Sequence, residues 1–221
     1  MIEHWLSYGL ADFVPFTPAT YLRLFELTNE ATWPLPLATW AAGLAAAVLA
    51  LGRRDWQVRA VLLLLAAAWA WVSWAYHLDR HAAINPAAPW YAAAFALQAV
   101  VLAALAARGG VTFSAAGPGV FIAAAGLALW PLLRPVDWQA VEVFGTAPDP
   151  TAVVTLGLLL MAAGRARWLW ITLPVPLLWC LASGLTLLAL ELPAAVPTLV
   201  LPVAGTIIWA RRRSNGLDGA R

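Results

Sequence analysis

The side chains best suited to chemistry gather between residues 69 and 86, in the stretch WAWVSWAYHLDRHAAINP. His77 and His81 are two of the three histidines in the chain, and Arg80 and Asn85 lie beside them. Residues four apart share one face of an α-helix. The two imidazoles are therefore spaced to hold one proton, one ligand or one metal ion between them. The alternative is that both lie at the level of lipid headgroups, where they are hydrogen-bonded or solvated.

A metal or haem site would need more ligands than these two histidines. The stretch has no glutamate of the kind that the zinc-protease version of this spacing requires. A third ligand would have to come from one of several scattered side chains: Asp79, Asp149, Glu191, Glu30 or His4. His77 and His81 are therefore candidate metal ligands that lack an assigned third partner.

Two carboxylates complete the candidate site. Asp149 lies between Pro148 and Pro150, where we expect a helix to begin because proline suits the first helical turn. Its side chain can cap the free N–H groups of that turn, or it can bind a substrate or a cation. Glu191 lies in a short connection before Pro193. We expect it to be solvated and keep it as a further candidate at the mouth of the site.

The elements that hold these side chains are hydrophobic. Of the 221 residues, 63% are hydrophobic and only 11% are charged, and the mean hydropathy is +0.78. Soluble domains are nearer half apolar and a quarter charged, so the composition predicts an all-α integral membrane protein. Every basic residue is arginine, which together with the abundance of alanine is typical of a GC-rich bacterial genome.

Seven apolar runs have about the length that a helix needs to cross a bilayer, roughly 20 residues. They cover residues 34–52, 57–78, 86–107, 116–134, 150–164, 167–189 and 193–210. We expect these seven runs to form one membrane domain over residues 34–210, followed by a basic tail at 211–221.

A further helix is expected before the first run. Thr17 followed by Pro18 is a typical helix start. A helix over about 18–31 would place four residues on one face: Tyr21, Leu24, Phe25 and Thr28. Such a segment is amphipathic and suits a membrane surface. We therefore expect residues 1–33 to form an interfacial segment over the membrane domain.

The arginines set the expected orientation. Ten of the thirteen follow the odd-numbered runs: Arg53, Arg54, Arg59, Arg108, Arg165, Arg167, Arg211, Arg212, Arg213 and Arg221. The positive-inside rule places these loops in the cytoplasm, so we expect the N-terminus outside and the C-terminus inside. Because the arginines are spread over several loops, they favour membrane topology over a nucleic-acid surface, and we expect no nucleic-acid partner.

Four motifs, in this order, resemble an uncharacterised family of small multi-pass bacterial inner-membrane proteins. The motifs are FTPATYLRLFELTNEATWP, YHLDRHAAINPAA, FGTAPDPTAVVTLGLLL and LPVPLLWC. The resemblance covers nearly the whole chain and is to a domain of unknown function, whose members are sometimes labelled permeases. It implies a helical membrane fold, and it implies no activity, cofactor or catalytic residue.

We expect a non-enzymatic function in which a small solute or ion is bound or transported through a polar site on the outer face. The candidate binding residues are His77, Arg80, His81, Asn85, Asp149 and Glu191. One alternative is a metal- or haem-binding membrane enzyme or redox subunit that uses His77 and His81 as ligands. Another is a structural partner subunit of a membrane complex, with no site of its own.

Overall fold

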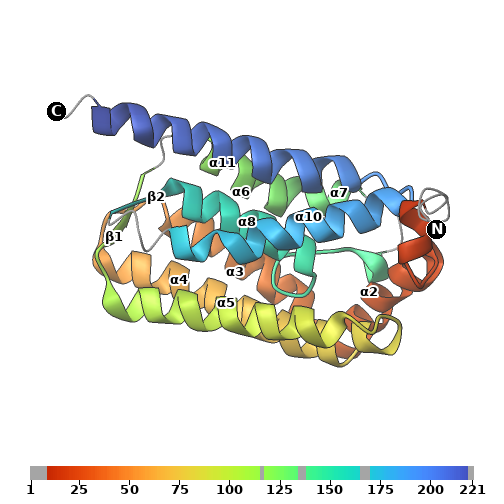
Figure 1. Ribbon diagram of the computed structural model, residues 1–221. Coiled ribbons are helices and arrows are strands. Elements are labelled where there is room, and N and C mark those ends of the chain that lie inside the picture. Colours follow the sequence, from red (N-terminus) through yellow and green to blue (C-terminus); the bar gives the residue numbers. More distant parts are fainter. Residues whose placement is uncertain (1–8, 115–116, 134–137, 165–169, 219–221) are drawn as a thin grey trace.

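The computed structural model describes residues 9–114, 117–133, 138–164 and 170–218, and these are almost entirely helical (Figure 1). The α-helices are α2 (Pro18–Thr32), α3 (Leu35–Leu49), α4 (Asp55–Trp71), α5 (Ala88–Arg108), α6 (Gly119–Ala124), α7 (Trp130–Leu133), α8 (Pro148–Met161), α10 (Pro174–Ala189) and α11 (Ala195–Asp218). The 3₁₀ segments are Leu10–Phe13, His81–Ala83 and Trp138–Ala140, and the π-helical segments are Val72–Leu78 and Ala125–Leu129.

Most of the longer helices run alongside one another, and different elements close the two ends of the bundle (Figure 1). At one end, α2 lies across the bundle. At the other end lie two short strands, β1 (Val111–Phe113) and β2 (Ala162–Gly164), which pair antiparallel. The expected helix over 150–164 is shorter than predicted, because its last three residues form β2. The helix ends at Met161, because the next three residues pair with β1 instead of continuing the helical hydrogen bonds.

Helix α8 is the centre of the bundle, and all of its residues are buried. It packs against α6, α10 and α11. The contact with α6 brings two backbones together, because a Cβ on Gly157 would lie 2.3 Å from the backbone nitrogen of Ala123. On α6, a Cβ on Gly119 would lie 2.4 Å from the carbonyl oxygen of Gly157. Such close approach at small residues is typical of helices packed in a membrane.

The expected N-terminal helix is confirmed as α2. Thr17 caps it by accepting a hydrogen bond from the backbone N–H of Thr20 at 3.2 Å, and Pro18 is the first helical residue. All four residues expected on one face are buried: Tyr21, Leu24, Phe25 and Thr28. This face packs on the protein itself, where the rings of Phe25 and Tyr76 stack with centroids 5.3 Å apart. Residues 1–8 of the expected interfacial segment lie outside the described residues.

Three helices in the described part of the chain are long and apolar enough to cross a membrane: Asp55–Ala83, Ala88–Arg108 and Trp170–Ala189. A fourth span is reached if α2 and α3, which meet at a bend of 95°, are taken together. A helix also lies within each of the other expected runs. However, the apolar helices in two of these runs, Gly119–Leu132 and Pro148–Met161, are shorter than a membrane span requires. Seven spans were expected, and the described part of the chain has three or four helices of spanning length.

Candidate functional site

His77 lies in an unusual piece of helix. The long helix that begins with α4 changes at Val72 into the π-helical segment Val72–Leu78, which contains His77. A turn follows, and His81 then opens the 3₁₀ segment His81–Ala83. π-helical turns are rare and occur frequently at functional sites. The regular helix does not continue to Asn85, yet the tight turn still brings Asn85 back to His81.

The three polar side chains of this corner form a hydrogen-bonded row. The Nδ1 atoms of His77 and His81 lie 3.4 Å apart, and Nε2 of His81 lies 3.1 Å from Nδ2 of Asn85. Oδ1 of Asn85 accepts from the backbone N–H of Ala87 at 2.9 Å, which fixes the orientation of the amide. The amide nitrogen of Asn85 therefore donates to His81.

This row also sets the tautomers of both imidazoles. Nε2 of His81 accepts from Asn85, so the proton of a neutral His81 lies on Nδ1 and is donated to Nδ1 of His77. His77 must then carry its own proton on Nε2. That atom is buried and has no hydrogen-bond partner among the described residues. The row thus ends on a buried N–H group that is available to a ligand or a water molecule.

Aromatic rings enclose His77. The ring centroids of Phe95, Trp179 and Tyr76 lie 4.5, 4.9 and 5.2 Å from that of His77. These rings come from α5, α10 and the π-helical segment, so three helices meet at one imidazole. His77 is consequently fully buried, at 0% exposure.

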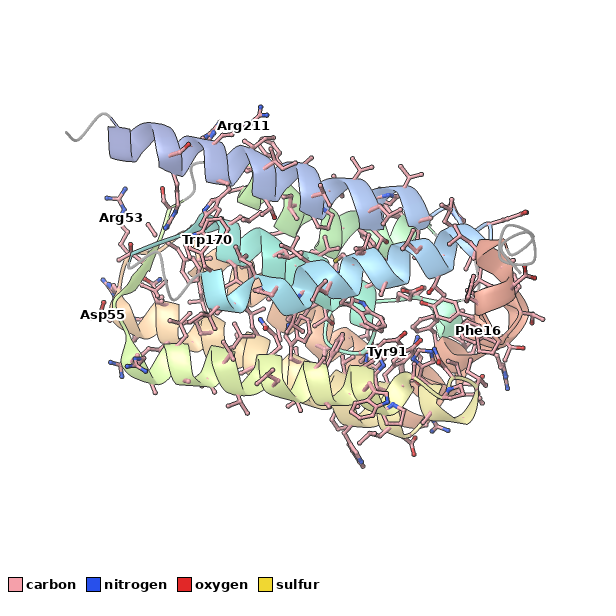
Figure 2. All side chains as sticks on the ribbon, in the orientation of Figure 1. Phe16, Arg53, Asp55, Tyr91, Trp170 and Arg211 are labelled. Atoms are coloured by element: carbon pink, nitrogen blue, oxygen red, sulfur yellow. The ribbon has the colours of Figure 1, made fainter. Side chains whose placement is uncertain are left out.

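His81 has a similar but slightly more open surrounding. Its ring centroid lies 5.5 Å from that of Tyr76 and 6.0 Å from those of Tyr91 and Phe16. Phe16 lies just before α2, and Figure 2 shows Phe16 and Tyr91 at the same end of the bundle. The segment leading into α2 therefore separates the histidine pair from the surface of the protein at this end of the bundle.

Asp149 forms a second polar group beside the first. Its Oδ1 accepts hydrogen bonds from Nε1 of Trp179 at 2.9 Å and from Oγ of Ser183 at 2.6 Å. The carboxylate is buried and lies in the first turn of α8, where the positive end of the helix dipole favours a negative charge. Trp179 joins the two groups, because its N–H donates to Asp149 while its ring contacts His77.

The expectation that Asp149 caps α8 is wrong. The N-cap is Ala147, without a side-chain hydrogen bond, and the helix already begins at Pro148. Asp149 therefore lies one position too late to be the cap. Its side chain instead accepts from two donors on α10, because burial against that helix leaves their N–H and O–H groups in need of an acceptor.

A small cavity lies between the two polar groups, with a volume of about 20 Å³. His81 and Asn85 line one side and Ser183 lines another, and Phe16 and Tyr21 also contribute to the wall. A water molecule needs roughly 10–15 Å³ of such volume. The cavity therefore has room for about one water beside His81, Asn85 and Ser183, whose hydroxyl binds Asp149.

Arg80 and Glu191 are not part of this arrangement. Nε of Arg80 lies 3.0 Å from Oδ2 of its neighbour Asp79, and the pair borders a separate surface groove beside α2. Glu191 is exposed after the end of α10, in the left-handed backbone region at φ 56°. Among the six candidate binding residues, the structure thus brings together His77, His81, Asn85 and Asp149.

The described residues offer no complete metal site. Within residues 9–114, 117–133, 138–164 and 170–218, no three His, Cys, Asp or Glu side chains lie close enough to share a metal ion. Nδ1 of His77 and Nδ1 of His81 face each other, and Nε2 of His81 faces the amide of Asn85. The described residues therefore lack the third ligand that a metal site at the two histidines would need.

Sequence reasoning missed the residues that hold Asp149. Trp179 and Ser183 lie four apart on α10, the same spacing that singled out the two histidines. A pair of hydrogen-bond donors at this spacing inside the apolar run 167–189 could have indicated that α10 binds a polar group. A further acid that the sequence did not single out, Glu142, is also buried.

Comparison with known families gives one match. A model of a family of unknown function (DUF6064) matches residues 19–217. Neither the search of curated proteins nor the search of solved structures found a match.

Proposed function

The chain belongs to the family of unknown function DUF6064, which brings no established activity, and we propose its function from the buried cluster itself. The protein binds a small solute or ion at His77, His81 and Asp149 and passes it across a bacterial cytoplasmic membrane. In its most concrete form, the transported ion is a proton.

The observation that carries this proposal is the burial of two linked polar groups in an apolar bundle. His77 and Asp149 have exposures of 0%, and His81 and Ser183 have exposures of 4% and 5%. Polar groups removed from water cost free energy unless they are hydrogen-bonded, and the buried Nε2 of His77 has no partner among the described residues. Ionisable residues that persist inside a membrane domain commonly serve transport or proton relay.

The hydrogen-bonded row supports a proton as the ion. Each imidazole accepts at one nitrogen and donates at the other, so a proton taken up at one end of the row can be released at its far end. The cavity for about one water lies between His81 and Ser183, and Ser183 contacts Asp149. For a proton to enter the row, Asn85 must release Nε2 of His81. The proton then leaves at Nε2 of His77, whose ring contacts Trp179, the donor to Asp149.

The cover over the site supports gated access. Phe16 contacts His81, and Tyr21 lines the cavity from α2. A solute larger than water does not fit a cavity of about 20 Å³, so its entry requires α2 and the preceding segment to move away from α5 and α10.

We place all seven helical segments within the membrane domain 34–210. Large apolar side chains are exposed on most helices, including Val48, Val100, Phe121, Leu132 and Leu178, and soluble proteins rarely expose so much contiguous apolar surface. α8 would span only about 21 Å at 1.5 Å per residue. It lies inside the bundle, however, so it needs no lipid-facing length of its own.

The distribution of charge supports an N-terminus outside. Figure 2 shows Arg53 at the end of the bundle opposite Phe16, and Arg211 in the same half of the bundle as Arg53. With the arginine-bearing end in the cytoplasm, the cover formed by residues 9–33 and the histidine site face outward, and the tail from residue 211 lies inside. Arg134, Arg165, Arg167 and Arg221 lie outside the described residues.

Proton flux into vesicles tests the proposal. Purified protein is reconstituted in liposomes that contain a pH-sensitive dye, and a potassium diffusion potential drives proton entry. We expect His77→Gln and Asp149→Asn to lower the flux about a hundredfold, the scale on which a lost proton-transfer group acts. The matched control, Glu191→Gln, changes an exposed carboxylate to an amide in the same way and should leave the flux unchanged.

Two results would reject the proposed proton pathway. Wild-type flux equal to that of empty liposomes would show that the protein does not transport protons. Equal flux in wild type, His77→Gln and Asp149→Asn would show that the cluster does not carry it and would favour a structural role for the protein.

A further inference from the structure

A second polar cavity lies at the opposite end of the bundle, with a volume of about 140 Å³. It lies between the start of α4 and the end of α5 and has a mostly polar lining. Three charged residues line its wall, Asp55, Arg59 and Arg108, together with two glycines, Gly109 and Gly110. Unlike the histidine cavity, it has two guanidinium groups in its wall and is large enough for a multi-atom group.

The two glycines keep one wall of this cavity open. Gly109 and Gly110 have φ values of 69° and 75°, a left-handed conformation that side chains other than glycine rarely adopt. A Cβ on Gly110 would meet no atom within 4 Å, so the space beside it is empty. Nη2 of Arg59 lies 3.8 Å from the position of a Cβ on Gly109. Arg59 thus reaches from α4 across to the turn that follows α5.

The charges of this wall favour an anion. Arg59 and Arg108 carry two positive charges and Asp55 carries one negative charge, which leaves the cavity with a net positive charge. α4 begins at Asp55, so the positive end of its dipole also lies at the cavity. The guanidinium fork matches the oxygens of a phosphate group in a bidentate way.

We propose that this cavity binds a phosphate group, with Arg59 and Arg108 as its ligands. Basic pockets between membrane helices at the cytoplasmic side bind anionic lipid headgroups, and a phospholipid headgroup would reach this cavity at the end of α5. Free phosphate has the same chemistry and is the other source. The site lies at the far end from the histidine cluster and is independent of the proposed transport.

Titrations of the full-length protein in detergent test this proposal. Native mass spectrometry measures the binding of phosphatidylglycerol and, as a phosphate-free lipid, of diacylglycerol with the same acyl chains. Thermal unfolding in sodium phosphate and in sodium chloride of equal ionic strength measures the effect of free phosphate. The variants are Arg59→Gln and Arg108→Gln. The matched control is Arg53→Gln, which removes an exposed arginine at the same end that does not line the cavity.

We expect phosphatidylglycerol to bind in preference to diacylglycerol, and Arg59→Gln and Arg108→Gln each to weaken this binding about tenfold, the effect of losing one charge-assisted hydrogen-bonding group. Arg53→Gln should bind as wild type does. Stabilisation by free phosphate that is lost in Arg59→Gln would support the same site with a soluble occupant. Arg59→Lys, which keeps the charge without the fork, controls for folding and should bind more weakly than wild type.

Three outcomes would overturn the site. Equal weakening by Arg53→Gln and Arg59→Gln would show a diffuse basic surface. Equal binding of phosphatidylglycerol and diacylglycerol, without stabilisation by free phosphate, would show that the phosphate is not recognised. Unchanged binding in Arg59→Gln and Arg108→Gln would show that neither guanidinium group is a ligand of the phosphate.

Discussion

The two ends of the bundle place their polar side chains in opposite ways. At the histidine end, His77 and Asp149 are fully buried and pair with other side chains. At the arginine end, Arg53 and Arg54 are exposed to the surroundings. Exposed charges orient a membrane protein at little cost, whereas buried polar groups cost free energy. The comparison teaches that the proposed transport site depends on the interior polar groups, whereas the exposed arginines set the expected orientation.

The largest expected effect is an all-or-none difference in labelling that tests whether the two ends lie on opposite sides of a membrane. Ala82→Cys introduces a thiol at the histidine end, and Ser114→Cys introduces one beside β1; both positions are exposed. A membrane-impermeant maleimide should label Ala82→Cys in intact cells and Ser114→Cys only after permeabilisation. The native Cys180 is buried and should stay unlabelled.

Labelling of both thiols in intact cells would contradict the opposite placement of the ends. Labelling of Ser114→Cys alone would reverse the expected orientation, with the N-terminus then inside.

A large effect on stability is expected from Trp179→Ala. This change removes the ring that contacts His77 and the N–H that donates to Asp149. The cavity and the lost donor together should lower the free energy of unfolding by about 3–5 kcal/mol. The control is Trp170→Ala, since Trp170 packs on Trp209 but is half exposed and its loss should cost much less. Similar losses in both variants, measured by denaturant unfolding in detergent, would count against a special role for the aromatic cluster.

A smaller effect is expected from Asp149→Asn. The amide keeps the size of the carboxylate but weakens the hydrogen bonds from Trp179 and Ser183 by removing the charge. We expect a loss of about 1–3 kcal/mol in the free energy of unfolding. Glu191→Gln makes the same chemical change at an exposed position and should leave the unfolding midpoint unchanged. A loss of equal size in Glu191→Gln would remove the distinction between buried and exposed acids.

Local sequence signals predicted the parts of the fold that depend on neighbouring residues. The Thr17–Pro18 start and the buried face of α2 were found from capping and periodicity. The spacing of His77 and His81 likewise predicted their contact. In each case the residues are three to seven positions apart, so local helical geometry alone brings them together.

Contacts between distant residues were beyond such signals. Asp149 was expected to cap its own helix, but a donor pair 30 and 34 residues further along the chain binds its carboxylate. Strands β1 and β2 pair across some 50 intervening residues, and neither three-residue stretch carries a strand pattern of its own. Arg80 was grouped with the histidines by position, whereas its ion pair with Asp79 borders another groove.

The contact between α6 and α8 has a mechanical consequence for gating. The backbones meet at Gly119 and Gly157 with no space for even a methyl group, and we expect these two helices to move together as one body. Asp149 lies on this body, while its donors Trp179 and Ser183 lie on α10. An opening motion of α10 would therefore break both hydrogen bonds to the carboxylate at once, which would couple access to the site with the state of Asp149.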